Sequence, residues 1–566
     1  MEKLSNLKSR PATQIMKLKC LGARYPSRLS FTRSLVNTMR DENWKIKRKH
    51  FKLDSKGYGS AVYEVKRPQG LISFVCFSAY LPEEQRTDRV IANSWDTSYV
   101  LVLGKVTKKH LARLQRNVPL QEVGRFTNSE IVLSRANKSL RLFQKVVDSL
   151  ANGKQPSLID INSVGYLLRT TAVYGSGKFG LMDFHNLRLI EGLDQPYRAE
   201  MLLVYLVREF SFDLVEHMAT SLNKKKAVQL SPEIKRYLGI GNATGLGMAP
   251  YLIHHPQLIH KWISCYERAL IEISKIKNPS IKKKNQFIEL LRDAKIYIEH
   301  CKTEDRLQNK KNILIAKELD LLIDAFTSGN IFSNTNPWLS VINMCKTNYS
   351  LDTCEMANVQ LIEIYPEISD RIANDMACTE EFHLKPESSL NDLKRIIEKE
   401  YNWALKINFK NKDANYFFWY VSEEKLEPRL GVRKIEKGAD LESPLDIGRM
   451  VSNLYKEICN MKVNLSKAYV ADLLLKHPNF RGIIKRIQSL SELSYSEIRD
   501  NVLGKNLLPI DMLRFKLSFY GASQYNPKSD RWLRVNFFSG APLSSELNNN
   551  KKNFPGLPIF QNSEVN

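Results

Sequence analysis

Two glycine-rich stretches, YGSGKFG at 174–180 and GIGNATGLG at 239–247, are the first places where this sequence could bind a ligand. Glycine is required where φ is positive or where the backbone comes close to another group. The second stretch precedes a segment with helical periodicity, so it could deliver the chain to a helix N-terminus, where backbone N–H groups and the helix dipole bind anions. The residues of this predicted anion site are Gly175, Gly177, Lys178, Gly180, Gly239, Gly241, Asn242, Thr244, Gly245 and Gly247.

Neither stretch matches an established nucleotide-binding motif. Residues 174–180 have GxGxxG spacing, but the dinucleotide fingerprint also needs a preceding strand, a following helix and an acid about 20 residues on, and Glu191 comes early. The Walker A pattern fails because Ala172 stands in place of its first glycine and Phe179 follows Lys178. The alternative interpretation is that the glycines allow tight turns and a close helix crossing.

Between the two stretches, residues 197–222 are apolar almost all round, which is typical of a buried helix. Glu209, Asp213 and Glu216 recur at spacings of four and three, and His217 follows Asp213 by four, so these side chains share one stripe. An Asp that contacts a His could orient the imidazole for acid/base chemistry, so Asp213 and His217 are the predicted catalytic pair. The competing interpretation is a solvated or ion-paired helix face, because structural ion pairs are common.

A second rank of candidates lies outside this pair. Arginine forks suit carboxylate and phosphate groups, and histidine exchanges protons near neutral pH. These candidates are Glu216, His254, His255, Arg429, Arg433, Arg514 and Arg531. Nearby glutamates could instead occupy Arg429 and Arg433 in ion pairs, and the aromatic residues interleaved with the C-terminal arginines fit a core better than they fit base stacking.

No metal site is predicted, and no motif assigns a cofactor. His254, His255 and His260 add imidazoles near the second glycine stretch, but no HExxH-type spacing accompanies them. The eight cysteines are scattered, and none forms a CxxC pair. This usage indicates a reducing compartment in which most of the thiols behave as buried apolar groups.

The chain is strongly basic, with 85 Lys and Arg against 60 Asp and Glu, a net charge of +25. Such an excess favours acidic partners such as nucleic acid, an anionic lipid surface or small phosphorylated or carboxylated molecules, although it could also be compositional drift. Residues 1–40 have no acid after Glu2 and no apolar periodicity, so they are predicted to be a basic arm that the core does not need for folding. An arm of this composition is also compatible with organellar import.

The elements that must position these groups indicate an α+β protein. Residues 44–104 read as strands, residues 127–150, 251–276 and 280–328 as helices, and NWALKINF and FKLSFYG as strands. The predicted organisation is β-rich N-terminal and C-terminal segments around a large, mainly helical middle. Its parts are a basic arm at 1–40, a β-rich segment at 41–125, a helical middle at 126–330, a mixed linking segment at 331–400, an α+β segment at 401–545 and a polar tail at 546–566.

These features favour a soluble enzyme that acts on a small anionic substrate held by the glycine-rich loops, although no motif assigns its reaction type. The alternatives are a nucleic-acid-binding protein that uses the basic arm and the Arg/aromatic C-terminal region, and a structural or interaction protein. The longest apolar stretch carries five ionisable residues, so no transmembrane segment is expected. A cytoplasmic location follows from these expectations.

Overall fold

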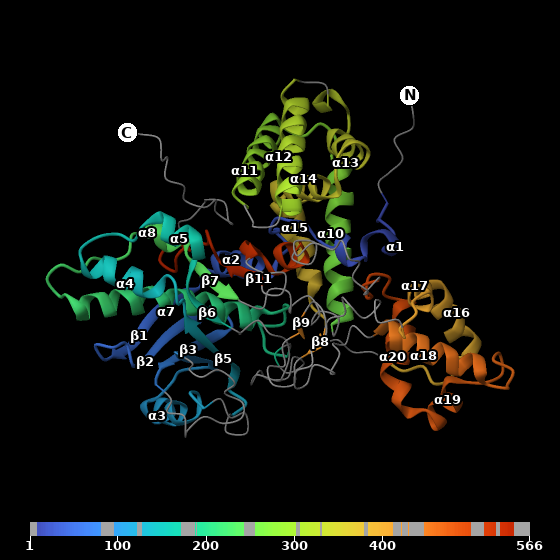
Figure 1. The fold of residues 1–566 in the computed structure, drawn as a ribbon, viewed down its shortest axis with the longest axis horizontal. Coiled ribbons are helices and arrows are strands. Elements are labelled where there is room, and N and C mark those ends of the chain that lie inside the picture. The colour runs from blue at the N-terminus through green and yellow to red at the C-terminus, as the bar shows by residue number, and fades with distance from the viewer. Residues whose placement is uncertain are drawn as a thin grey trace.

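The computed structural model describes most of the chain, and Figure 1 shows its course. The described residues are 8–80, 96–120, 127–170, 187, 189–242, 255–301, 306–328, 331–378, 383–410, 420–421, 428–429, 447–499, 514–527 and 533–547. Of the predicted anion site, only Gly239, Gly241 and Asn242 fall within these ranges. The stretch at 174–180, together with Thr244, Gly245 and Gly247, lies outside them.

One mixed sheet contains strands from both ends of the chain (Figure 1). Its order is β1 (Lys45–Leu53), β2 (Gly59–Arg67), β3 (Gly70–Ser78), β4 (Thr97–Leu103), β5 (Glu130–Lys138), β6 (Tyr166–Thr170), β7 (Gly239–Asn242), β11 (Leu533–Phe537) and β10 (Ala522–Pro527). Neighbouring strands are antiparallel except β6 and β7, which run parallel. The strands predicted for residues 44–104 are confirmed, and β10 and β11 complete the same sheet instead of forming a C-terminal unit of their own.

Helices cover both faces of this sheet. The long helix α7 (Arg198–Leu222) packs on one face together with α4 (Phe143–Ala151) and α2 (Phe31–Asp41). Most of the side chains of α7 are buried, as its apolar composition predicts. On the other face, α3 (Lys108–Asn117) covers a smaller apolar cluster that includes Val62, Val100 and Leu133. Helices α5 (Leu158–Val164) and α8 (Pro232–Tyr237) lead into β6 and β7 respectively.

The remaining helices form two further groups beside the sheet (Figure 1). The first comprises α10 (Pro256–Ser274), α11 (Ile281–His300), α12 (Arg306–Thr327), α13 (Pro337–Asn348), α14 (Leu351–Ile364) and α15 (Pro366–Ala373). The second comprises α16 (Leu390–Glu400), α17 (Asn402–Leu405), α18 (Ile447–Asn460), α19 (Val470–Lys476) and α20 (Arg481–Leu490). The α+β fold class, with a sheet and a largely helical middle, is therefore confirmed.

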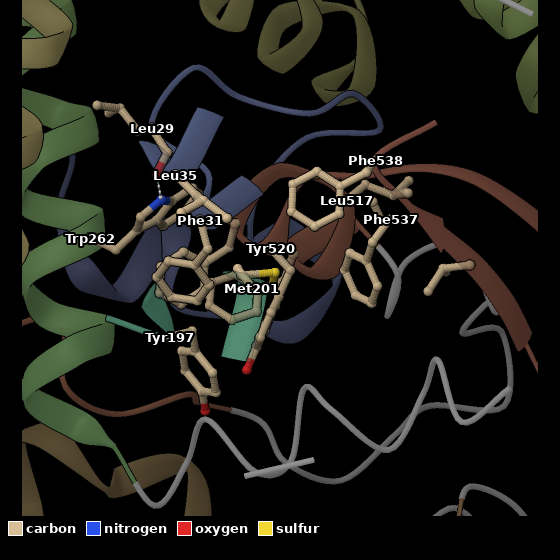
Figure 2. Packing of buried hydrophobic residues seen from close by; sticks show 14 of the residues in the cluster. Leu29, Phe31, Leu35, Tyr197, Met201, Trp262, Leu517, Tyr520, Phe537 and Phe538 are labelled. Carbon is tan, nitrogen blue, oxygen red and sulfur yellow. Dashed lines mark hydrogen bonds between the residues drawn. The ribbon is translucent and has the colours of Figure 1, made fainter. Parts of the chain in front are cut away.

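The N-terminal residues are part of the core, which corrects the prediction of a dispensable basic arm. Met16, Leu21, Leu29 and Leu35 are at most 1% exposed. Figure 2 shows Leu29 and Leu35 packed beside Trp262 of α10. Trp262 donates its indole N–H to the Leu29 carbonyl at 3.1 Å. The segment fills the joint between the sheet and the first helical group.

Three local predictions are wrong because alternation or a capping pattern was coincidental. Thr127 and Glu130 do not begin a helix; Glu130 begins strand β5, and its carboxylate accepts a hydrogen bond from the Thr127 backbone N–H. In NWALKINF the alternating stretch begins with α17, and FKLSFYG is a π-helix over Lys516–Tyr520. All five side chains of that π-helix are buried, so its polar residues do not mark a solvent face.

The described glycines of β7 are required by close packing. A Cβ atom on Gly241 would lie 2.6 Å from ring atoms of Tyr166, which is directly beside it on β6 and only 3% exposed. A Cβ on Gly239 would clash with the Phe537 carbonyl oxygen of β11. Neither position has positive φ. The alternative interpretation of close backbone approach therefore accounts for these two residues.

We expect Gly241→Ala to destabilise the protein by about 1–3 kcal/mol, because the Tyr166 ring has no free space into which it can move. The control is Gly482→Ala in helix α20, where an added Cβ meets nothing within 4 Å and alanine favours the helix. Urea unfolding midpoints measure both. Equal stability of Gly241→Ala and the parent would show that close packing does not require this glycine.

Candidate ligand-binding site

The two glycine-rich stretches leave the sheet from neighbouring strands. Strand β6 ends at Thr170 and β7 ends at Asn242, and these two strands are adjacent and parallel. Parallel strands end at the same edge of a sheet, and ligands of α/β proteins commonly bind outside such carboxyl ends. The chain thus departs toward both glycine-rich stretches from one edge.

Each departure is followed by the N-terminus of a long helix. The chain after β6 reaches α7, whose N-cap is Tyr197, and the chain after β7 reaches α10, whose N-cap is His255. The two N-cap rings contact each other, with centroids 6.4 Å apart at 86°. Neither N-cap side chain forms a capping hydrogen bond. The positive ends of two helix dipoles therefore meet at one point.

Polar side chains that are almost fully buried surround this junction. We call Tyr197, Glu200, His255, Lys516 and Tyr520 the polar cluster; each is 6% exposed or less. Rings of Tyr197 and Tyr520 pack at a centroid distance of 5.2 Å, and Figure 2 shows their hydroxyl ends pointing the same way, away from Leu29 and Leu35. Glu200 lies in the first turn of α7. Buried polar groups in an apolar core are costly, so their concentration here requires a physical cause.

The hydroxyl of Tyr520 is the clearest case. It is buried and forms no hydrogen bond of normal geometry within the described part of the chain. Burial, then the nearby Tyr197 hydroxyl and the Glu200 carboxylate, raise the pKa of Tyr520 well above its usual value. Tyr520 therefore remains protonated and keeps a hydrogen-bond donor available for a ligand.

Lys516 precedes Tyr520 by one turn of the π-helix. It is fully buried, and its Nζ lies 5.7 Å from the centroid of the Phe537 ring. Burial lowers the pKa of Lys516 well below its ordinary value, because the charged ammonium form loses its hydration. An uncharged lysine amine can accept a proton or attack a carbonyl carbon. Single-turn π-helices are frequent at functional sites.

Asp213 and His217, the predicted catalytic pair, lie elsewhere. Asp213 is 15 residues and His217 is 19 residues after the first residue of α7, so they stand about 22 Å and 28 Å along the helix from its N-terminus. One small substrate cannot contact both the N-terminal turn and these side chains. The expectation that the second glycine stretch and this pair serve one substrate is thus not supported by the arrangement of the helix.

The stripe of α7 that contains these residues ties the helix to its neighbours. Asp213 accepts a hydrogen bond from the Tyr63 hydroxyl and pairs with Arg48 at 2.9 Å, both from the sheet. His217 Nε2 lies 2.8 Å from the carbonyl oxygen of Asp54. The structure therefore gives Asp213 and His217 separate partners, in keeping with the interpretation of an ion-paired face.

Two other glutamates of the stripe are also engaged. Glu216 pairs with Lys235 at 2.6 Å and accepts a hydrogen bond from the Leu230 backbone N–H. Glu209 accepts from the Ser544 hydroxyl, and burial raises the pKa of Glu209. Asp213 and Glu209 border a cavity of about 260 Å³ with Tyr63 and Lys235. We assign this cavity to the tertiary contacts of α7.

The second-rank arginines and histidines are distributed widely. Arg514 donates to the carbonyls of Lys19 and Gly22 at 2.6 and 3.0 Å, so it fixes the N-terminal segment. His255 belongs to the polar cluster. Arg429 takes part in the short strand β9 (Pro428–Arg429), which pairs with β8 (Tyr420–Val421). His254, Arg433 and Arg531 lie outside the described residues.

The described residues contain no group of three or more His, Cys, Asp or Glu side chains that could hold a metal ion. None of the described helices combines the length and the apolar character that a membrane crossing needs. All eight cysteines are free thiols.

Comparison with protein families, with curated proteins and with solved structures finds no match for this chain. The assignment of function therefore depends on the geometry of the site. Sequence reasoning missed Tyr197, Glu200, Lys516 and Tyr520; the first two had a detectable signal, because they lie where the chain after the first glycine stretch enters an apolar helix. Lys516 and Tyr520 had none, because their segment was interpreted as an alternating strand.

Proposed function

We propose that the protein is an enzyme that binds a small substrate through a carboxylate or phosphate group at the meeting point of the N-termini of α7 and α10. The observation that supports this most is the contact between the two N-cap rings, Tyr197 and His255, beside the buried hydroxyl of Tyr520. Backbone N–H groups of the first helical turns supply donors that the helices themselves leave unused. Two converging dipoles favour an anion more than one does.

Within this proposal each polar residue has a role. Tyr520 donates a hydrogen bond to the anion or to a developing negative charge on the substrate. Lys516 accepts a proton from the substrate, since its buried amine is uncharged. The free thiols accord with a reducing compartment such as the cytoplasm, which we include in the proposal.

Replacing Tyr520 by phenylalanine removes one hydroxyl and keeps the ring that packs against Tyr197. We expect the variant to be as stable as the parent, because a buried hydroxyl that forms no hydrogen bond of normal geometry contributes little to folding. Its affinity for a bound anion should fall about tenfold, the loss expected for one hydrogen bond to a charged group. The measurement is the anion-dependent rise in melting temperature with inorganic phosphate, pyrophosphate, citrate and adenosine monophosphate.

Tyr205→Phe is the matched control. Tyr205 is fully buried on helix α7, but its hydroxyl donates to the Pro542 carbonyl at 2.8 Å. This variant should lose stability and keep the response to anions. The proposal fails if none of the four anions raises the melting temperature of the parent, or if Tyr520→Phe responds to them as strongly as the parent does.

A further inference from the structure

Strand β1 is an edge strand with an unusual charge. Its nine residues, KIKRKHFKL, contain five Lys or Arg and no acid. Helix α3, KKHLARLQRN, contains four Lys or Arg and no acid. These two short elements, far apart in the sequence, therefore hold nine of the cations responsible for the net charge of +25.

The strand register places the lysines of β1 on the face of the sheet that α3 covers. Lys45 lies opposite Lys66, Lys47 opposite Glu64 and Lys52 opposite Ser60. Opposite residues point to the same side of a sheet. On β2 this side also carries Val62, which belongs to the apolar cluster beneath Leu114 of α3. The lysines of β1 and the helix α3 thus share one face, with α3 over the inner strands and β1 at the open margin.

Few acids neutralise this face. Glu64 is 3.7 Å from Lys49, and the buried Glu130 is taken by Arg113 and His110 of α3. Arg48 points to the opposite face, where it pairs with Asp213. Seven exposed cations form no ion pair within the described part of the chain: Lys45, Lys47, Lys52, Lys66, Lys108, Lys109 and Arg116. We call these seven residues the basic face.

We propose that the basic face binds nucleic acid through its phosphate backbone, without sequence preference. Lys45 and Lys47 are about 6.6 Å apart along the strand, and the lysines from Lys45 to Lys52 span about 23 Å, so one extended row can contact several phosphates of one strand. This activity is independent of the anion site at α7 and α10. It also differs from a nucleic-acid site on residues 1–40, where Arg10, Arg28 and Arg33 pair with internal carboxylates.

Edge protection and membrane binding account for the charge less completely. Lysines on an edge strand prevent association of sheets through their edges, but this does not account for the cations of α3, which is not an edge. An anionic membrane would also attract the charge. However, surface-bound segments usually insert apolar side chains, and none of the exposed large apolar residues among those described lies on β1 or α3.

The test compares two double variants of the full chain with equal loss of charge. Lys45→Glu with Lys47→Glu alters the basic face. Lys310→Glu with Lys317→Glu alters exposed lysines of α12 in the first helical group. Fluorescence anisotropy measures binding to a labelled RNA strand of about 20 nucleotides and to a DNA duplex of about 20 base pairs between about 50 and 200 mM KCl, the range over which phosphate contacts are sensitive to salt. Vesicles with and without phosphatidylserine form the third arm.

We expect the parent to bind nucleic acid with an affinity that falls as salt rises. Reversal at Lys45 and Lys47 should weaken binding to the RNA strand at least about tenfold at the lowest salt concentration. It should also reduce the slope of log K against log [salt] by about 1.4, or about 0.7 for each lost phosphate contact. The α12 variant should retain the slope of the parent. Three results would overturn the proposal: no binding by the parent, equal effects of the two double variants, or binding to anionic vesicles alone.

Discussion

A chain that begins at Asp41 should fail to unfold cooperatively. The deletion would remove buried side chains such as Met16, Leu21 and Leu29, and would expose the apolar surfaces against which they pack. It would also remove Arg10, which binds Glu267 and Glu355, two carboxylates whose side chains are only 4% exposed. Loss of one partner of a buried ion pair alone costs about 3–5 kcal/mol. Total stabilities are usually about 5–15 kcal/mol, so the sum of these losses should unfold the protein.

Thermal and urea unfolding followed by near-ultraviolet circular dichroism measure this result. Two single variants distinguish loss of specific contacts from loss of charge. Arg28→Ala breaks pairs with Glu363 and Asp370 inside the protein and should cost about 3 kcal/mol or more. Arg40→Ala removes a 40%-exposed side chain paired with its neighbour Asp41 and should change stability by less than about 1 kcal/mol. A sharp, parent-like transition of the shortened chain would show that the core does not need the N-terminal segment.

Lys516→Met should make the protein more stable. The lysine is fully buried, and its pKa in the folded protein is well below its value in the unfolded chain. Between these two values the unfolded state binds more protons, so the stability of the parent rises with pH up to about 10.5. At neutral pH the parent therefore carries a penalty that methionine, of similar length and without charge, does not have. The melting temperature should rise, and its dependence on pH between about 7 and 10 should become flatter.

The exposed Lys317→Met on α12 is the control and should change neither quantity. A residue kept for structure destabilises the fold when it is replaced, whereas one kept for chemistry can stabilise it. Lys516→Met should still show the anion-dependent rise in melting temperature, because the amine is not one of the anion's proposed donors. A lower melting temperature for Lys516→Met at every pH would show that the amine stabilises the fold, and its proposed role as a base would then be wrong.

The sequence predicted those parts of the fold whose periodicity arises from one-sided or complete burial. The strands at 44–104 and the helix that became α7 were read correctly for this reason. In FKLSFYG, Phe515, Leu517 and Phe519 alternate with polar residues, which predicts a strand. Lys516 and Ser518 are nevertheless as buried as the apolar residues, so the alternation carried no information about a solvent face. A short pattern cannot reveal this, because burial of polar residues is decided by distant segments.

The candidate site was predictable only in part. Glycine-rich stretches ahead of helices indicated that helix N-termini would be important, and His255 was among the candidates. Tyr520 could not be associated with Tyr197, because 323 residues separate them and only the tertiary fold brings the two segments together. Asp213 and His217 were chosen because they are one helical turn apart. The same spacing serves equally well to attach a helix to two different neighbours.

The position of β7 in the sheet has a consequence for synthesis of the chain. β7 is complete at Asn242, but its second neighbour, β11, ends at Phe537, 295 residues later. At about 5–20 residues per second a ribosome needs about 15–60 s to produce the intervening chain. During that time β7 has an unpaired edge, and the N-terminal segment lacks Arg514, which later binds the carbonyls of Lys19 and Gly22. The nascent chain must therefore be shielded from aggregation until nearly the whole protein has emerged, and chaperone engagement should extend late into translation.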